Sequence, residues 1–404
     1  MKIGILREGK TPPDKRVPFT PTQCELLKNT FEDLELVVQP SPIRCFSDDL
    51  YTQKGIVLQE DLSDCDVLFG VKEVPIKDLM ADKHYFFFSH THKFQEYNRP
   101  LLKAMLDNGL KMTDYECLTR KDGSRVLGFG RYAGIVGAYN GFRGLGIRLG
   151  RYELKPAHEC DDFEELKEEL KKVDLPNIKI LLTGSGRVAR GAEEILKLLE
   201  LKELNVEEYL SQESFQEPVF CRADADSYVK HGQGKEFKFE DFFKNGGDYV
   251  SDFEKFYKST DMFIAGHFWD QSSPVFFTQE DAKRDDFRIQ FISDISCDIA
   301  DPIPSTLRPS TIADPFYDYN PQTGSEESTF SSDKNISVMA VDNLPCELPK
   351  DASKDFGSHL VEEIVPLLFS NDADGIIERA TITNGGKLTS NYSYLQDYVD
   401  AYKG

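Results

Sequence analysis

Short apolar runs alternate with amphipathic segments along the first 115 residues of the chain. Short apolar runs are typical of buried strands, and apolar residues that recur every three or four positions are typical of helices. The pattern predicts strands at 2–7, 34–39, 67–72, 85–89 and 111–114, and helices at 20–29, 50–54 and 99–108. This alternation is typical of an α/β fold.

A second alternation begins at residue 179. The run 179–183 is apolar, and strand-like runs return at 261–266 and 288–293. The segment 200–260 is polar and irregular, and we interpret it as an insertion. Residues 132–146 form a helix with small residues on one face, which favours close packing between two lobes and an interdomain hinge. We expect the tail from about residue 351 to return to the first lobe.

The run 179–183 leads into a glycine-rich turn and an amphipathic helix. The turn reads Gly184-Ser185-Gly186-Arg187-Val188, and a further glycine follows at 191. Glycines let the backbone approach a pyrophosphate, and a helix N-terminus supplies N–H donors and a positive dipole end. Because a strand precedes this turn and a helix follows it, the motif predicts a dinucleotide site. The alternative is an ordinary helix start in another α/β sheet.

These patterns together predict two Rossmann-like lobes with parallel sheets, the second lobe inserted into the first. The expected substrate and catalytic domain comprises residues 1–136 and 348–404. The expected dinucleotide-binding domain comprises residues 137–347.

The composition argues against nucleic-acid and membrane partners. The chain has 404 residues, of which 70 are acidic and 48 basic, so its formal charge is −22. Such a charge repels nucleic acid and anionic membranes. The N-terminus lacks the apolar run of a secretion signal, and no window is apolar enough to span a membrane. We therefore expect a cytoplasmic protein, as a monomer or a homodimer, with no nucleic-acid or membrane partner.

The eight cysteines are widely spaced and form no C-x-x-C pair. This spacing argues against zinc and disulfide frameworks and favours buried thiols. His90 and His92 would lie on one side of a continuing strand, so a metal pair is conceivable, but no third ligand is evident in the sequence. We expect no metal.

Three basic residues lie at strand ends or in a loop, where catalytic and substrate-binding side chains are often found. Lys72 ends an apolar strand, where partial desolvation would lower its pKa and allow it to act as a base. His90 also follows an apolar run, and its intrinsic pKa suits acid–base work. Arg16 lies after Pro12 and Pro13, in a stiff loop that would expose its guanidinium to a carboxylate. Each also has a structural alternative: a lysine or arginine solvated at the surface, or a histidine satisfied in the fold.

Several segments, taken in chain order, resemble the lysine-forming saccharopine dehydrogenases, within the larger group of alanine dehydrogenases and transhydrogenase α subunits. The resemblance covers nearly the whole chain apart from 200–260 and the last thirty residues. It is carried by the turn at 184–191 and by Gly70-Val-Lys72-Glu-Val-Pro75, Phe88-Ser-His90-Thr-His-Lys-Phe-Gln95, Phe129-Gly-Arg-Tyr-Ala-Gly134, Ser293-Asp-Ile-Ser-Cys-Asp298, Asp342-Asn-Leu-Pro345 and Leu348-Pro-Lys-Asp-Ala-Ser353.

The resemblance implies a role for each matching residue. Lys72 would accept the proton of the substrate's secondary amine or stabilise the imine, and His90 would be the second catalytic residue. Nearby carboxylates would tune these two groups, and other side chains would bind the substrate or the dinucleotide. The implied tuning residues are Glu73 and Glu116, the substrate-binding residues are Arg16, Gln95 and Phe129, and the cofactor-binding residues outside the glycine turn are Arg125 and Asp298.

The choice between NAD and NADP depends on an acidic residue that would hold the ribose hydroxyl. Glu207 and Glu208 have the usual offset from the glycines, but their segment is helical in pattern. If 218–224 is the second strand instead, Asp224 favours NAD, while Arg222 would accept a 2′-phosphate. We expect NAD, without excluding NADP.

The expected activity is an oxidoreductase that acts on the C–N bond between an amino acid and a 2-oxo acid, with both small molecules as its partners. Hydride would pass between this carbon and the nicotinamide. One alternative is an alanine dehydrogenase-like enzyme that accepts ammonia. Another is a dinucleotide-binding protein of the same fold without turnover.

Overall fold

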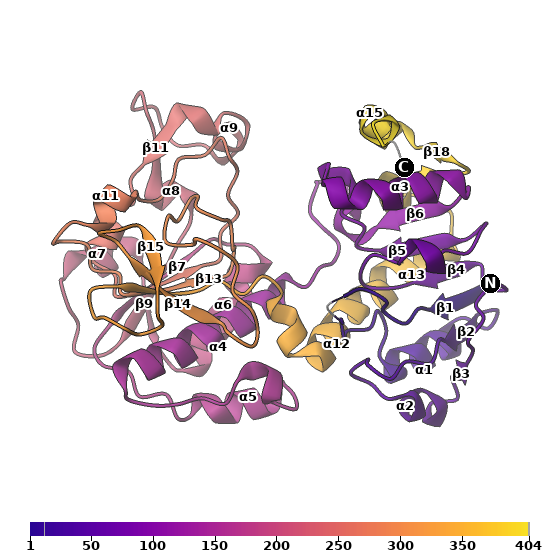
Figure 1. Ribbon diagram of the computed structural model, residues 1–404, viewed down its shortest axis with the longest axis horizontal. Coiled ribbons are helices and arrows are strands. Elements are labelled where there is room, and N and C mark those ends of the chain that lie inside the picture. The colour runs from indigo at the N-terminus through magenta and orange to yellow at the C-terminus, as the bar shows by residue number, and fades with distance from the viewer. Residues whose placement is uncertain (12, 403–404) are drawn as a thin grey trace. The chain divides into compact units, whose positions relative to one another are not determined.

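The computed structural model describes residues 1–11 and 13–402 and divides the chain into two compact units. Unit 1 comprises Met1–Phe129 and Pro349–Gly404, and unit 2 comprises Gly130–Leu348. Both ends of the chain lie in unit 1 (Figure 1). The first boundary falls at 129/130, not at 136/137, because the first helix of unit 2 already begins at Gly130. Pro12, one of the two prolines expected to stiffen the loop before Arg16, lies outside the described residues.

Unit 1 is built on one eight-stranded sheet, with strand order β18-β17-β6-β5-β4-β1-β2-β3. The first six strands along the chain pair in parallel, and β17 and β18 add an antiparallel edge. The strands are β1 (Lys2–Ile5), β2 (Glu35–Val38), β3 (Val57–Leu58), β4 (Val67–Phe69), β5 (His84–Phe87), β6 (Lys111–Asp114), β17 (Thr381–Asn384) and β18 (Lys387–Leu388). The helices are α1 (Pro21–Thr30), α2 (Asp48–Gln53), α3 (Arg99–Asp107), α12 (Pro349–His359), α13 (Val365–Leu368), α14 (Ile376–Ala380) and α15 (Gln396–Asp400).

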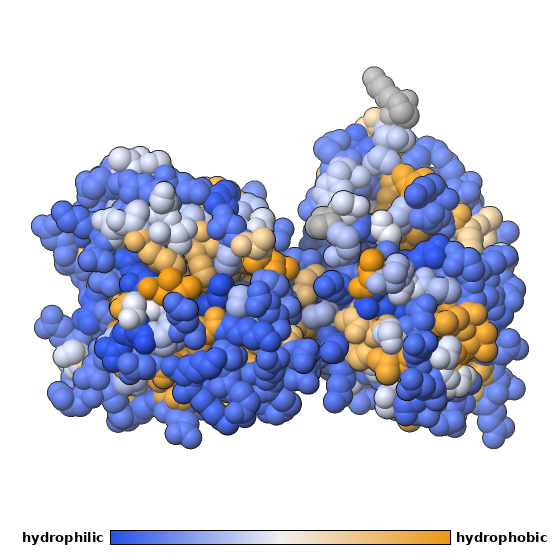
Figure 2. Space-filling model, turned by 60° about the horizontal axis from the view of Figure 1, so that its bottom comes forward, coloured by the Kyte–Doolittle hydropathy of each residue, from blue (hydrophilic) through white to orange (hydrophobic). Residues whose placement is uncertain are grey.

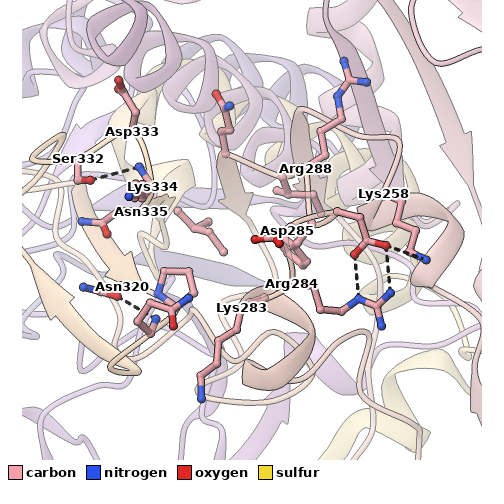
Figure 3. Close-up of a pocket in the computed structure, with 18 of the residues that line it drawn as sticks. Lys258, Lys283, Arg284, Asp285, Arg288, Asn320, Ser332, Asp333, Lys334 and Asn335 are labelled. Carbon is pink, nitrogen blue, oxygen red and sulfur yellow. Dashed lines mark hydrogen bonds and ion pairs between the residues drawn. The ribbon is translucent and has the colours of Figure 1, made fainter.

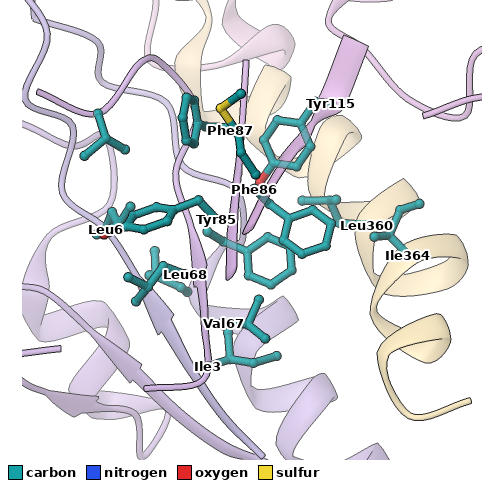
Figure 4. Packing of buried hydrophobic residues seen from close by; sticks show 14 of the residues in the cluster. Ile3, Leu6, Val67, Leu68, Tyr85, Phe86, Phe87, Tyr115, Leu360 and Ile364 are labelled. Carbon is teal, nitrogen blue, oxygen red and sulfur yellow. The ribbon is translucent and has the colours of Figure 1, made fainter. Parts of the chain in front are cut away.

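The C-terminal helices complete the core of unit 1. A π-helical turn, Leu360–Ile364, joins α12 to α13. Leu360 and Ile364 are fully buried in the same cluster as Phe86 and Tyr115 (Figure 4). The expected return of the tail to the first lobe is therefore confirmed, and the cause is apolar burial.

Unit 2 holds a second eight-stranded sheet, with order β15-β14-β16-β13-β12-β7-β9-β8. Its strands are β7 (Lys179–Thr183), β8 (Lys202–Leu204), β9 (Val219–Ala223), β12 (Met262–Ala265), β13 (Phe291–Asp294), β14 (Phe316–Asn320), β15 (Ser325–Glu327) and β16 (Ile336–Met339), and a hairpin pairs β10 (Val229–His231) with β11 (Tyr249–Ser251). Its helices are α4 (Gly130–Leu149), α5 (Phe163–Leu170), α6 (Arg187–Leu198), α7 (Val206–Ser211), α8 (Ala225–Tyr228), α9 (Phe239–Lys244), α10 (Glu254–Tyr257) and α11 (Gln279–Ala282). Together the two mostly parallel sheets confirm the expected α/β class.

Two expectations about unit 2 are wrong. The segment 200–260 is not an irregular insertion, because it contributes β8 and β9 to the sheet and packs Phe253 and Phe256 into the core. The alternation of strands and helices in this segment is hard to recognise from the sequence, because β8 is short and polar. The small residues of α4 were expected to pack between the two lobes, but they pack within unit 2: a Cβ added to Gly134 would stand 1.9 Å from the backbone oxygen of Val188 in α6.

The surface is strongly polar. On the face drawn in Figure 2, hydrophilic residues predominate and apolar residues are scattered among them. No helix among the described residues combines the length and apolarity needed to cross a membrane.

Candidate functional site

The carboxyl ends of the parallel strands in unit 1 gather most of the chemically active side chains. Strand β1 lies between β2 and β4, and the order of connection reverses there, which is where open α/β sheets bind ligands. Glu8 follows β1, Lys72 follows β4, His90 follows β5 and Asp114 ends β6. Because these strands are parallel neighbours, the four residues share one edge of the sheet.

Glu8 positions the backbone of Lys72. Its carboxylate accepts the N–H groups of Val71 at 2.7 Å and of Lys72 at 2.8 Å. Burial raises the pKa of Glu8 to about 7 despite these two hydrogen bonds. Lys72 itself is half-buried. Glu8 was not singled out from the sequence, because nothing local to residue 8 indicates a partner more than sixty positions away.

Glu73 joins His90 to Lys10. Its Oε1 lies 2.8 Å from Nδ1 of His90, and its Oε2 accepts from Nζ of Lys10 at 2.7 Å. Burial would raise the pKa of Glu73, but the hydrogen bonds from His90 and Lys10 outweigh it and hold this pKa at about 2. The carboxylate is therefore ionised at neutral pH and orients the imidazole.

The backbone of His90 is left-handed, with φ of 52°. A non-glycine residue seldom adopts this conformation, and it persists where the surroundings hold it. Here the buried carboxylate of Asp114 accepts the N–H groups of His90 at 3.1 Å and of Ser89 at 2.9 Å. Because β5 ends at Phe87, His90 and His92 do not continue a strand, and the expected reason for pairing them disappears.

Arg16 is buried, so the expectation of an exposed guanidinium is wrong. It is 2% exposed and forms a two-pronged ion pair with Asp14, with Nε–Oδ1 at 3.0 Å and Nη2–Oδ2 at 2.6 Å. Burial would raise the pKa of Asp14, but Arg16 lowers it to about 2. The guanidinium carbon stands 4.1 Å from the ring centre of Phe129, which stacks on Phe356 at 4.4 Å. The structure thus brings Arg16 and Phe129 together.

The remaining predicted residues of unit 1 lie nearer the surface. Glu116 binds Nζ of Lys93 and Nη2 of Arg125, each at 2.8 Å. Its described ion pairs therefore go to these residues and to His92, and not to Lys72 or His90. Gln95 is exposed and accepts a hydrogen bond from Asn98 at 3.1 Å.

In unit 2 the glycine turn leads from β7 into α6. Gly184 has φ of 98°, and a Cβ there would stand 2.7 Å from the backbone oxygen of Gly266. Gly186 is the N-cap of the twelve-residue helix α6, and a Cβ there would meet nothing within 4 Å. Ser185 is exposed, and Arg187 and Val188 open the helix. The first N–H groups of a helix have no intrahelical acceptor, so this turn can bind an anionic diphosphate.

Asp224 lies at the end of the strand next to β7. It caps α8 directly after β9, and β9 is the parallel neighbour of β7. The N–H of Gly184 donates to the oxygen of Ala223 at 2.9 Å, which places the end of β9 beside the glycine turn. Glu207 and Glu208 lie in α7, after the short edge strand β8. Arg222 lies 3.9 Å from Glu193, to which it is ion-paired.

Asp298 and His267 also follow strands of this sheet. Burial, and then Asp294, raise the pKa of Asp298 to about 6. His267 follows β12, and its Nδ1 lies 2.7 Å from Oγ1 of Thr183 at the end of β7. Burial lowers the pKa of His267 to about 3, so the ring is neutral. His267 was not singled out from the sequence, because its segment has only the pattern of an apolar strand end.

A cavity in unit 2 lies away from the glycine turn. It measures about 870 Å³ and is lined by residues that precede β13 and β16, at the strand ends opposite the glycine turn. Its basic residues are largely paired: Arg284 with Asp286, and Lys258 with the same carboxylate (Figure 3). Because acidic and basic groups are balanced there, the cavity offers no net charge to a ligand.

The sequence is similar to those of several known proteins. Residues 4–136 match the family described as alanine dehydrogenase/PNT, N-terminal domain. An alpha-aminoadipic semialdehyde synthase of Arabidopsis thaliana is 31% identical over 437 residues, which cover 97% of this chain and 41% of that protein. A saccharopine dehydrogenase (NAD(+), L-lysine-forming) of Emericella nidulans is 25% identical, with 91% of this chain and 92% of that protein covered. The chain thus spans less than half of the Arabidopsis relative.

A solved L-alanine dehydrogenase structure shares the fold. Its TM-score is 0.65 at 18% identity, and the match covers 99% of both chains. This likeness confirms the fold class, and the sequence relatives confirm the resemblance to saccharopine dehydrogenases.

Proposed function

We propose that this chain, whose residues 4–136 form an alanine dehydrogenase/PNT N-terminal domain and which is related to the saccharopine dehydrogenases, is a nicotinamide-dependent dehydrogenase. Its substrate would be the secondary amine that links an amino acid to a 2-oxo acid, as in saccharopine. The observation that carries the proposal is Lys72 next to the Glu73–His90 pair at the carboxyl edge of the unit 1 sheet.

The residues of unit 2 fit a dinucleotide. The open space at Gly186, the N-terminus of α6 and the adjacent carboxylate of Asp224 suit a pyrophosphate and its ribose. The bound nicotinamide would supply the hydride acceptor or donor. We propose NAD as the cofactor, because Asp224 follows the strand next to β7 and Arg222 is paired with Glu193.

Lys72 and His90 would move the protons. In the oxidative direction Nζ of Lys72 would accept the proton that the substrate nitrogen loses as the neighbouring carbon is oxidised. Water then adds to the imine carbon, and its proton passes to Nε2 of His90, because Nδ1 is bonded to Glu73. Lys72 would return its proton to the nitrogen as the carbinolamine forms. In the collapse, the carbinol hydroxyl would give its proton to Lys72 and His90 would protonate the departing amine, so the C–N bond breaks and the 2-oxo acid is released.

Arg16 would bind a substrate carboxylate from a fixed position. Asp14 and the ring of Phe129 hold the guanidinium, so little conformational entropy is lost when a second carboxylate approaches. Gln95 and Phe129 would contact the rest of the substrate, and Glu116 would set the charge around His92 and Lys93. Arg125 and Asp298 remain proposed cofactor contacts.

The location and assembly also remain proposals. No disulfide joins the eight cysteines, all of which lie among the described residues, and this fits a reducing compartment such as the cytoplasm. We propose a monomer or a homodimer.

A substrate-pair assay tests the activity. The full chain is given NADH with 2-oxoglutarate and lysine, and in parallel with pyruvate and ammonia. The proposal predicts NADH oxidation with the first pair. Activity with the second pair alone would favour the alanine dehydrogenase-like alternative, and NADH binding without turnover on either pair would favour a non-catalytic dinucleotide-binding protein.

A further inference from the structure

Three potential metal ligands meet in unit 1, beside the proposed active-site edge. They are His92 in the turn after β5, Asp114 at the end of β6 and Cys117 in the turn that follows. One donor atom from each lies within 4.8 Å of the donors of the other two. Together they offer an imidazole, a carboxylate and a thiol, which differ in kind from the exposed acidic clusters that are common on protein surfaces.

The carboxylate of this cluster is fixed before any ligand arrives. Asp114 is fully buried, and Oδ1 accepts the N–H of Glu116 at 2.7 Å. Oδ2 accepts the N–H of His90 and the hydroxyl of Ser89. Backbone and hydroxyl groups therefore hold the carboxylate toward the cluster, so binding would require no reorganisation of Asp114.

His92 is oriented in the same way. Its Nδ1 is inaccessible to solvent, lies 3.7 Å from Oδ2 of Asp114, and has no hydrogen-bond partner within the described residues. This separation allows an ion pair but is too long for a hydrogen bond, so a cation between the two atoms would give each of them a direct ligand bond. The other ring nitrogen, Nε2, lies 3.6 Å from Oε2 of Glu116. A carboxylate behind the second nitrogen is the usual outer-shell arrangement of a metal-bound histidine.

We infer that His92 Nδ1, Asp114 and Cys117 Sγ form a binding site for a divalent cation that prefers nitrogen and sulfur ligands, with Zn²⁺ the best match. Tetrahedral zinc places its ligand atoms about 3.5 Å apart, so donors within 4.8 Å need to approach by roughly 1 Å. Water would take the fourth position. Cysteine binds as the thiolate and His92 as the neutral ring, so the thiol proton and the Nδ1 proton are released to solvent, and the two anionic ligands balance the two charges of the cation.

Nothing in this inference depends on the proposed dehydrogenase activity. His92 lies two residues beyond His90 in sequence. Asp114 accepts the backbone N–H of His90, in the turn that contains His92, and that of Glu116, in the turn that contains Cys117. A cation that binds the folded state and not the unfolded state would stabilise unit 1 by mass action.

The test uses Co²⁺ alone, added to the metal-free full chain, because a cobalt–thiolate bond gives a charge-transfer absorption that other ligands do not give. We expect this band to saturate at one Co²⁺ per chain, to disappear when Zn²⁺ is added, and to be absent in Cys117→Ser. Cys45→Ser is the control, since Cys45 is another partly buried cysteine of unit 1. His92→Gln keeps the thiol and should weaken Co²⁺ binding at least tenfold.

Circular dichroism identifies which variants are folded. If only one of Cys117→Ser and His92→Gln folds, that variant alone tests the inference. The inference is overturned if the unsubstituted chain gives no thiolate band, if the band persists in Cys117→Ser, if Cys45→Ser removes it, or if His92→Gln binds Co²⁺ unchanged.

Discussion

The carboxylate of Glu8 accepts the backbone N–H of Lys72 at 2.8 Å, which ties the loop after β1 to the end of β4. Burial raises the pKa of this carboxyl to about 7, above its ordinary value of 4.5. The folded state therefore binds this proton more tightly than the unfolded state. The stability contributed by the group is complete below about pH 4.5 and is lost as the pH rises through 7.

Glu8→Gln should remove this pH dependence, because the amide cannot ionise. Relative to the unsubstituted chain, the variant should gain up to about 3 kcal/mol in the free energy of unfolding between pH 5 and pH 8. Urea unfolding at the two pH values measures the difference. Glu35→Gln, at an exposed position in the same unit, is the control and should show no such trend. A stability difference for Glu8→Gln that is equal at both pH values would contradict the assignment.

Gly186→Ala should separate folding from cofactor binding. An added methyl group meets nothing within 4 Å, so the melting temperature should stay within a few degrees. The same methyl group would occupy the space where a pyrophosphate approaches the backbone, so NADH affinity should fall at least tenfold. Fluorescence titration with NADH measures the affinity, and Gly247→Ala is the matched control. Unchanged NADH affinity in Gly186→Ala would refute the proposed pyrophosphate contact.

Gly134→Ala should destabilise unit 2. The new Cβ would stand 1.9 Å from the oxygen of Val188, so α4 and α6 must separate. Overpacking of this kind costs about 1–3 kcal/mol or more, because it moves backbone and not a flexible side chain. Thermal unfolding measures the loss, and Ile147→Ala, at an exposed position of the same helix, should have little effect. A Gly134→Ala variant as stable as the unsubstituted chain would show that these helices pack less closely.

Asp224→Asn should weaken the preference for NAD. Loss of a charge-assisted hydrogen bond costs about 1.5–3 kcal/mol, which corresponds to a fall of roughly 10- to 100-fold in kcat/KM with NAD. The value with NADP should fall less, because no such bond is made to the 2′-phosphate. Glu207→Gln, in α7, should leave both values unchanged. If Glu207→Gln reduces the preference and Asp224→Asn does not, the ribose contact belongs to α7.

Local patterns were enough to predict the fold class and the glycine turn. The strand, turn and helix at 179–199 are contiguous, and their apolar spacing is undisturbed. The segment 200–260 was misjudged because β8 and α7 are short, and β8 is a polar edge strand whose burial pattern differs from that of β7. Contiguous periodicity therefore predicts central elements better than edge elements.

The site was harder to predict, because its partners are distant in sequence. Arg16 could be singled out from its loop, but its burial depends on Phe129, which stacks on Phe356 from the C-terminal segment. Glu8 and Lys72 are joined only by the pairing of β1 with β4. His92 and Cys117 likewise meet only because β5 and β6 are neighbours. No spacing rule along one chain indicates such contacts.

The most direct test of the account is the turnover of Lys72→Met with NADH, 2-oxoglutarate and lysine. General acid–base catalysis by one side chain contributes about 10²- to 10⁴-fold, so kcat should fall at least 100-fold. NADH affinity should stay unchanged, because the glycine turn lies in unit 2. A Lys72→Met variant that turns over at the rate of the unsubstituted chain would contradict the account.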